Sequence, residues 1–329
     1  MWAYIARRIL WTIPIALGIV ILTFCLFTYV APDPARLLVG KYASPEKLEA
    51  QREKMGLNKP RWFDFAAVRR PAQSGRPAGI AGVIDTQFFD TLLWRLPDSE
   101  HYHKPLTLLI AEKGPISLSI QLPIFIIELG VQLILALICA QYRGRWPDTT
   151  ITFGAVVGMC VPALSMIVFF QWLLGFKLGL FPVAGWGGLR YAAYFGTLPI
   201  IVGVLSGIGG GTRFYRSIML EEIYADYIRT ARAKGVGQSN VLLVHVLRNA
   251  MVPVITRTVA SLPFLILGAL IVERMFQIPG LGYVLVEAIE NQDRSIVLGM
   301  TYLVSLVYCV MLLVTDICYM LVDPRVKLQ

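Results

Sequence analysis

The residues able to do chemistry in this chain are few, and their spacing excludes the common catalytic sites. The three histidines are His101, His103 and His245, and none has the partner histidine four residues away, beside a glutamate, that an intramembrane metalloprotease requires. His101 and His103 would share one side of a strand, but no cysteine or carboxylate at a suitable spacing completes a metal site. Gly40-Lys41 lacks the flanking residues of a phosphate-binding P-loop. We therefore expect no catalytic residue, no metal site and no cofactor in this chain.

Two carboxylates lie inside apolar runs, where an ionised group is costly. Glu128 is near the middle of the second run, and Asp316 is in the last one. Because an intramembrane charge is a functional candidate by default, both are candidates for lining a translocation path. The sequence leaves open that each is instead neutralised or paired inside a helix bundle. Glu273, beside Arg274, is expected to form an ion pair at a membrane boundary.

The elements that position these groups must be membrane helices. Of 329 residues, 56% are apolar and 16% are charged, whereas about 25% are charged in ordinary soluble domains. The mean hydropathy is +0.64. A soluble protein does not expose or bury so much apolar surface, so the composition excludes a soluble enzyme and predicts an all-α, polytopic membrane protein.

Charge and cysteine content exclude two further classes. The net charge is +9, but no basic stripe with interleaved aromatic residues occurs outside the loops, so no nucleic-acid partner is expected. Each of the five cysteines is inside or at the edge of an apolar run, without metal-ligand spacing. This placement favours buried small side chains and predicts no disulfide.

Six apolar runs are long enough, with flanking residues where needed, to cross a bilayer core of about 30 Å. The predicted transmembrane helices are Ile9–Val30, Ile116–Ala140, Thr149–Leu174, Leu198–Gly211 with flanking residues, Val252–Val272 and Ile296–Val322. In the fourth, Gly203, Gly207 and Gly211 share one face and predict close helix packing. The chain thus divides into residues 1–30, an extracytoplasmic segment 31–115, a core 116–322 that includes a cytoplasmic loop 212–251, and a cytoplasmic tail 323–329.

Charge asymmetry orients the spans. With the N-terminus inside, the cytoplasmic pieces hold twelve Lys and Arg residues, and the two short outer loops hold four. Because positive residues stay on the cytoplasmic side, both termini are expected in the cytoplasm. In the outer segment, Ser44–Met55 predicts a short helix that stops at Gly56. Thr86–Leu96 has helical apolar spacing, which fits either a helix on the membrane surface or one packed on its own domain.

The longest cytoplasmic segment, Thr212–Thr256, is basic and helical in pattern. Strong helix formers occupy Glu221–Lys234, and Gly235 is expected to end that helix. After a turn at 236–240, residues 241–248 restart a helix that leads into the fifth span. A helix–turn–helix at the membrane face fits docking to a cytoplasmic partner, although the pattern alone also allows a plain solvated loop.

This segment resembles the cytoplasmic coupling loop of ABC-transporter permeases of the oligopeptide and dipeptide type. The resemblance is carried by DYIRTARAKG at Asp226–Gly235 and HVLRNAMVPVIT at His245–Thr256. Where the general importer signature has Glu-Ala-Ala, this chain has Arg229-Thr230-Ala231, which resembles the peptide-transporter variant. Further landmarks follow in the family's order: APDPAR, REKMGLNKP, RGRWPD, FPVAGW, IPGLG and LVDPRV. Residues 62–113 hold no landmark, which leaves the cargo and the geometry of the outer partner open.

The resemblance implies a coupling helix at Asp226–Gly235 that sits in a groove of an ATPase subunit. The implied site residues are Asp226, Tyr227, Arg229, Thr230, Ala231, Arg232, Ala233, Lys234 and Gly235, followed by His245 and Arg248. Small Ala231 and Ala233 would pack closely against the partner, and a β-carbon at Gly235 would meet a crowded turn.

The implied function is that of a permease subunit, with the type I importer fold, in a binding-protein-dependent ABC importer for oligopeptides or dipeptides. Its partners would be a second, similar permease, two ATP-binding subunits and an extracytoplasmic solute-binding protein, in the cytoplasmic membrane of a bacterium or archaeon. ATP and Mg²⁺ would be bound by the ATPase subunits, and this chain would not be an enzyme. Nickel and sugars stay open as cargo.

Two readings from other classes compete with this one. An ATP-independent secondary transporter or channel would be expected to contain inverted sequence repeats, and no repeat is evident. An intramembrane enzyme would need a nucleophile and a base within the spans, and no such set stands out.

Overall fold

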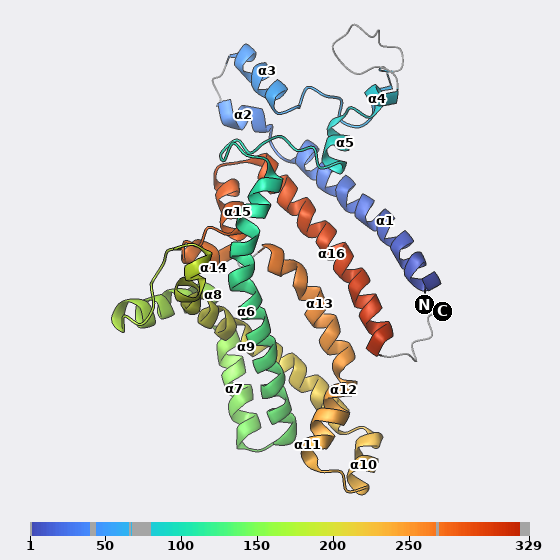
Figure 1. The fold of residues 1–329 in the computed structure, drawn as a ribbon, viewed down its shortest axis with the longest axis vertical. Coiled ribbons are helices and arrows are strands. Elements are labelled where there is room, and N and C mark those ends of the chain that lie inside the picture. Colours follow the sequence, from blue (N-terminus) through green and yellow to red (C-terminus); the bar gives the residue numbers. More distant parts are fainter. Residues whose placement is uncertain (1, 40–43, 66, 68–79, 268–269, 323–329) are drawn as a thin grey trace. The chain divides into compact units, whose positions relative to one another are not determined.

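The computed structural model describes residues 2–39, 44–65, 67, 80–267 and 270–322. Within these ranges every regular element is helical, which confirms the predicted all-α class. Figure 1 follows the helices from α1 (Trp2–Cys25) to α16 (Arg294–Val322). The chain forms two compact units. The larger unit consists of Met1–Ile5, Lys113–Tyr283 and Val310–Gln329, and the smaller unit consists of Ala6–Glu112 and Val284–Cys309.

Among the described residues, four helical stretches are long and apolar enough to cross a membrane: Leu10–Val30, Leu106–Gln141, Leu189–Ile223 and Arg294–Cys318. Two bent helix pairs meet the same criterion together: Trp146–Cys160 with Ala163–Lys177, bent by 95°, and Gln238–Asn249 with Met251–Leu262, bent by 56°. Counting each pair as one span gives up to six spans by length and composition. The second pair differs from the prediction, because it begins at Gln238, in the segment predicted as a cytoplasmic loop, and only its second helix overlaps the predicted span Val252–Val272. The fourth span extends on both sides of Leu198–Gly211, as a helix of crossing length must.

The third span, predicted at Thr149–Leu174, is sharply broken in its middle. Helix α7 (Trp146–Cys160) ends just before Val161-Pro162, α8 (Ala163–Phe170) begins just after it, and a π-helical segment, Gln171–Lys177, follows. A proline disfavours the helical conformation of the residue before it, and Val161 is extended, with φ −89° and ψ 120°. The steric effect of Pro162 on Val161 therefore explains the break.

In the larger unit, α6 (Leu106–Gln141) and α9 (Ala192–Ile223) approach each other along the predicted glycine face. At Gly203, Gly207 and Gly211, an added β-carbon would lie 2.6, 2.2 and 2.0 Å from atoms of Ile124, Glu128 and Gln132 on α6. Real β-carbons do not come so close to other heavy atoms. Only glycine permits this helix separation, so the prediction of close packing is confirmed.

An ion pair joins α7 and α9 in the same unit. Asp148, within the RGRWPD landmark, is 4% exposed, and its carboxylate accepts hydrogen bonds from Nε and an Nη of Arg216 at 2.6 and 2.9 Å. The N–H of Gly144 donates to the same carboxylate at 3.0 Å. Buried charges persist only when they are paired and hydrogen-bonded in this way.

The IPGLG landmark forms the start of α15 (Leu281–Glu290) around a buried carboxylate. Glu273, on α14 (Leu270–Met275), is fully buried and accepts a hydrogen bond from the N–H of Tyr283 at 3.1 Å. Ser117 accepts one from the N–H of Leu281 at 2.7 Å. The structure thus places the buried carboxylate of Glu273 at the N-terminus of α15, where a negative group is favourable.

The smaller unit has an aromatic core. The rings of Trp62 and Phe88 lie 5.0 and 5.5 Å from that of Phe24, centroid to centroid. Helix α5 (Gln87–Leu92) contributes Phe88, so the amphipathic segment predicted at Thr86–Leu96 packs on its own unit and ends earlier than predicted. Helix α3 (Pro45–Lys54) follows the prediction and ends before Gly56, whose φ is +67°. The segment around His103 is a turn with φ +50° and not a strand.

Candidate functional site

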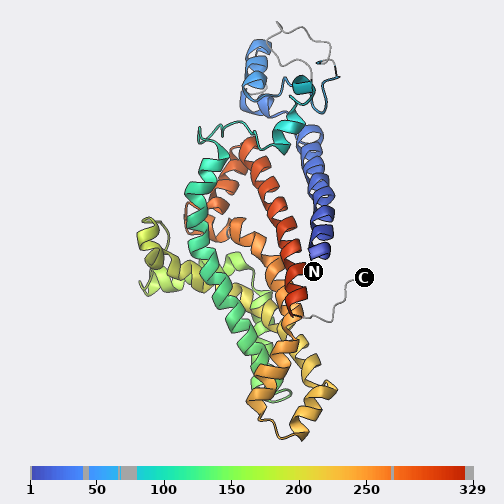
Figure 2. The ribbon, with the colours of Figure 1, turned by 45° about the vertical axis from the view of Figure 1, so that its right-hand side comes forward.

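The predicted coupling helix exists as a separate element, α10 (Asp226–Ala233), after α9 ends at Ile223. Figures 1 and 2 both show it beside α11 (Gln238–Asn240) and α12 (Leu247–Asn249), which belong to the same unit. Asp226 lies in its first turn, where a negative charge favours the helix dipole. The sequence pattern therefore located this helix to within about two residues.

One face of α10 is anchored in the larger unit. Ile228 is 0% exposed and joins a buried cluster with Met219, Ile223, Val241 and Val246. Ala231 is 9% exposed and lies on the same buried face. The small size of Ala231 thus lets α10 pack on its own chain, whereas Ala233, on the other face, is exposed. The apolar anchor fixes the helix to the body of the unit.

The opposite face of α10 is exposed and mainly basic. It carries Asp226, Tyr227, Arg229, Thr230, Arg232, Ala233 and Lys234. Arg229 and Asp226 are 3.4 Å apart, but both are highly exposed, so this pair adds little stability. These side chains are therefore available to another molecule.

Tyr227 ties α10 to the end of α9. Its hydroxyl donates a hydrogen bond to the carboxylate of Glu222. Burial, and then this hydrogen bond, raise the pKa of Tyr227 to about 12. The phenol is thus neutral at physiological pH and acts as a hydrogen-bond donor that sets the angle between the two helices.

The turn after α10 depends on Gly235. Its φ is +76°, a left-handed conformation that side chains rarely adopt. The N–H groups of Gly235 and Val236 donate to the carbonyls of Arg232 and Ala231 at 3.0 and 3.2 Å, which closes the helix end. No atom lies within 4 Å of a β-carbon added at Gly235. The expected left-handed turn is present, but it is open and not crowded.

The chain restarts as a helix sooner than expected. The turn was predicted at 236–240, whereas α11 already begins at Gln238 and continues through a π-helical segment, Val241–Val246, into α12. His245 is partly exposed and Arg248 is exposed. Both lie on the segment that connects α10 to α13, in the predicted fifth span.

A second candidate site is a cavity of about 170 Å³ in the larger unit, within the membrane-spanning helices. Its polar lining residues are Gln121, Glu128, Gln132, Tyr215, Arg257, Thr258 and Ser261. They come from α6, α9 and α13 (Met251–Leu267). A polar cavity among membrane helices is where a path for a polar cargo is expected.

Glu128 both lines this cavity and has a partner. Its Oε1 accepts a hydrogen bond from Nε2 of Gln132 at 2.6 Å, and the same amide donates to the carbonyl of Gly207 at 3.1 Å. The sequence left open whether Glu128 lines a path or is paired inside the bundle. The two are compatible, because Glu128 lines the cavity and is also hydrogen-bonded to Gln132. Asp316, the other predicted residue, lies on α16 and is not among the residues that line this cavity.

The sequence analysis did not identify Arg257 as a candidate. Its only signal is its charge, because it is the one arginine inside the predicted span Val252–Val272. Its guanidinium lies 4.6 Å from the ring centroid of Phe214 and 5.7 Å from that of Tyr215, and its side chain is exposed. An exposed charge at membrane depth must face water or another protein and not lipid. Arg257 therefore marks the side of α13 that faces a water-filled space or a partner.

Comparisons with known proteins show the family of this chain. Residues 132–328 match the family described as binding-protein-dependent transport system inner membrane component, and residues 1–90 match the N-terminal model of such membrane components. A putative peptide transport system permease protein of Brucella abortus is 34% identical over 99% of both chains. An oligopeptide transport system permease protein of Bacillus subtilis is 31% identical over 99% of this chain and all of its own. A glutathione transport system permease protein of Salmonella choleraesuis is 30% identical over 99% of both chains.

The family match covers α10 and most of the membrane helices, and the relatives align from end to end. This protein is a multi-pass membrane protein, and its chain belongs to the family of inner membrane components of binding-protein-dependent transport systems.

Proposed function

We propose that this chain is a permease subunit that imports peptides with energy from ATP hydrolysed by partner subunits. The observation that carries the peptide assignment is the end-to-end similarity to permeases named for peptide, oligopeptide and glutathione transport. The assembly would contain a second, similar permease, two ATP-binding subunits and an extracytoplasmic solute-binding protein. Both termini and α10 would face the cytoplasm of a bacterium or archaeon. ATP and Mg²⁺ would be bound by the ATPase subunits alone.

The exposed face of α10 supports the coupling role. Its apolar anchor at Ile228 transmits movement to the body of the larger unit, whereas its basic side chains stay free for an ATPase groove. When two ATPase subunits close on ATP, they would move α10 as a lever, and the spans would expose the central path alternately to the two sides. Such a shift requires that the ATPases bind one state of the permease more tightly than the other.

The 170 Å³ cavity supports a path along α6, α9 and α13. Glu128 and Arg257 would offer a negative and a positive group to a zwitterionic peptide in transit. Asp316 would line a different part of the path. Replacement of Glu128 by Gln tests this role, because unchanged uptake across cationic, neutral and anionic peptides would show that Glu128 does not read the cargo.

The experiment that tests the proposed function is purification of the tagged chain from its native membrane, with identification of its partners by mass. We expect a second six-span permease and P-loop ATPases, and peptide-stimulated ATP hydrolysis by the recovered complex. Recovery of the chain alone, with ATP-independent flux after reconstitution, would instead support a secondary transporter or channel.

A further inference from the structure

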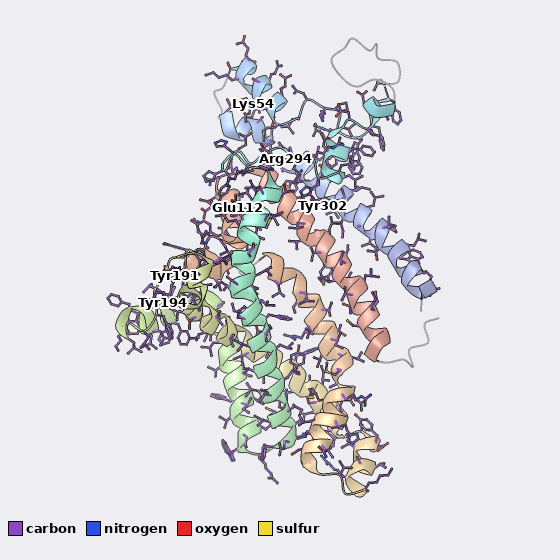
Figure 3. All side chains as sticks on the ribbon, viewed as in Figure 1. Lys54, Glu112, Tyr191, Tyr194, Arg294 and Tyr302 are labelled. Carbon is purple, nitrogen blue, oxygen red and sulfur yellow. The ribbon has the colours of Figure 1, made fainter. Side chains whose placement is uncertain are left out.

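The smaller unit contains two adjoining cavities that share an arginine. Their volumes are about 260 and 350 Å³, and both are lined by Leu57, Gln87 and Arg294. Arg294 is the first residue of α16, and Figure 3 labels it together with Lys54 of α3, which lines the smaller of the two cavities. All residues that line both cavities belong to the smaller unit.

Two other cations in these cavities are already neutralised. Nε of Arg52 donates to Oδ2 of Asp33 at 3.1 Å. Burial alone would raise the pKa of Asp33, but the hydrogen bond and charge of Arg52 outweigh it and hold that pKa below its ordinary value. Nζ of Lys59 lies 2.8 Å from Asp85 and 2.6 Å from Asp90. Neither Arg52 nor Lys59 is therefore free to bind a further anion.

Arg294 differs from these two residues. Its side chain is only partly exposed, and within the described part of the chain no hydrogen bond, ion pair or ring contact engages it. The charge of Asp33 acts on it, but that carboxylate is bound to Arg52. A guanidinium keeps its charge in proteins, and a partly desolvated charge without a partner is unfavourable. The guanidinium of Arg294 is therefore available to bind an anionic group.

The lining of the 260 Å³ cavity adds to this preference. Once Lys59 is paired, the cavity still presents Lys54, Arg95 and Arg294 against Glu53. The apolar side chains of Phe24, Leu57 and Leu298 line the same cavity. A positive group beside an apolar wall matches a carboxylate that is attached to a hydrophobic side chain.

We propose that Arg294 binds the C-terminal carboxylate of the cargo peptide, with the last side chain against the apolar wall. The proposal rests on the proposed peptide transport, because a peptide supplies such a carboxylate at its end. A guanidinium holds a carboxylate through two parallel N–H···O bonds, which a lysine ammonium does not reproduce. An acidic side chain of the solute-binding protein offers the same chemical group, and the test separates these two sources.

The test compares uptake of trialanine and of its C-terminal amide by the complete transporter in proteoliposomes, with saturating solute-binding protein. The variants are Arg294→Gln, Arg294→Lys and the control Arg36→Gln, which removes an exposed arginine of α2 (Pro34–Val39) outside both cavities. A charge-assisted hydrogen bond is worth about 1.5–3 kcal/mol, so Arg294→Gln should raise the KM for trialanine about ten- to a hundredfold. The KM for the amide should change less than about twofold, and Arg294→Lys should fall between wild type and Arg294→Gln.

Each outcome either supports or overturns the proposal that Arg294 binds the peptide carboxylate. If Arg294→Gln raises the KM only for the free acid, the proposal stands. If both peptides are affected equally and a parallel titration shows that the variant needs more solute-binding protein for half-maximal rate, the carboxylate belongs to that protein and the proposal fails. No change relative to Arg36→Gln also overturns it. Uptake of trialanine by the wild type separates these results from a failure of the peptide assignment itself.

A second measurement uses the wild-type complex, so that it does not depend on the folding of a variant. A tripeptide with a photoreactive C-terminal side chain is cross-linked during turnover, and the labelled segments are identified by mass. Label at residues 53–59 or 294–298 is the expected result. Label confined to other parts of the transporter would contradict the proposal.

Discussion

The interface of α6, α7 and α9 and the coupling segment around α10 use the same residue types in opposite ways. Each has an arginine–aspartate pair and a glycine. In the interface, Asp148 is buried, its partner Arg216 is partly buried, and Gly211 leaves no room for a methyl group. In the coupling segment, the Asp226–Arg229 pair is exposed and the space around Gly235 is open. Burial therefore decides which residues hold the bundle together and which remain available to a partner.

The largest effect is expected when the buried pair is broken. Arg216→Leu leaves the carboxylate of Asp148 without its charge partner, and the loss of one partner of a buried pair costs about 3–5 kcal/mol. Replacing both residues with leucine removes the uncompensated charge and should restore part of the stability. Thermal unfolding of the detergent-solubilised protein measures the difference. The matched variant Arg229→Leu should leave unfolding unchanged, and equal effects at the two arginines would refute the comparison.

A smaller loss of stability is expected at the glycine face. Gly211→Ala places a β-carbon about where the amide of Gln132 now lies, and such overpacking costs about 1–3 kcal/mol. Gly210, the next residue on the same helix, has no atom within 4 Å of an added β-carbon. Gly210→Ala is therefore the control and should be neutral or slightly stabilising. If both variants unfold alike, the close approach of α6 and α9 is not what requires glycine.

At Gly235 the backbone, and not the space, limits substitution. A left-handed conformation costs a residue with a side chain about 1–2 kcal/mol, so Gly235→Ala should destabilise the helix end only mildly. Gly235→Arg should still assemble in the membrane but should uncouple transport, because it alters the turn beside the coupling helix. Uptake and membrane assembly are measured in parallel. Normal peptide uptake by Gly235→Arg would count against a coupling role for this turn.

The exposed face of α10 should affect docking without affecting folding. Arg229→Glu reverses a charge that is highly exposed in this chain, and we expect it to weaken binding of the ATPase subunits. Co-purification of ATPases with the tagged variant measures the effect, and unchanged thermal unfolding serves as the folding control. A wild-type yield of ATPases would argue against docking at this face.

The smallest effect is expected from Tyr227 and only in alkaline solution. Because its pKa is raised from the ordinary 10 to about 12, its neutral hydroxyl stabilises the folded state fully below pH 10. That contribution is lost as the pH rises from about 10 to about 12. Tyr227→Phe should remove this part of the pH dependence. Ultraviolet titration of the tyrosines, wild type against variant, should lose a single high-pH phenol, and an unchanged curve would contradict the assignment.

Local patterns predicted the periodic features of this protein well. The four unbroken apolar spans, the glycine face of α9 and the helix that ends before Gly235 all follow from neighbouring residues, and the structure contains each of them. Long-range packing was not predictable in this way. The burial of Ala231 on its own chain and the open space at the Gly235 turn depend on where distant segments lie, which neighbouring residues do not encode.

The candidate site follows the same rule. Glu128 was recognised because a carboxylate is conspicuous in an apolar run, and the lone arginine at 257 carried the same signal but was overlooked. That Glu128 and Arg257 line one cavity depends on where the fold places α6 and α13, which no local pattern contains. The shared cavities at Arg294 likewise bring residues 24, 57 and 298 together from distant parts of the sequence.

The central claim is that α10 couples this permease to ATP hydrolysis in partner subunits. The most direct measurement is peptide-stimulated ATP hydrolysis by the purified complex, with wild-type chain and with Arg229→Glu. We predict that peptide and solute-binding protein stimulate hydrolysis by the wild-type complex and that the variant loses this stimulation while its chain stays folded. Peptide uptake that proceeds equally without ATP, or equal stimulation in both complexes, would contradict the account.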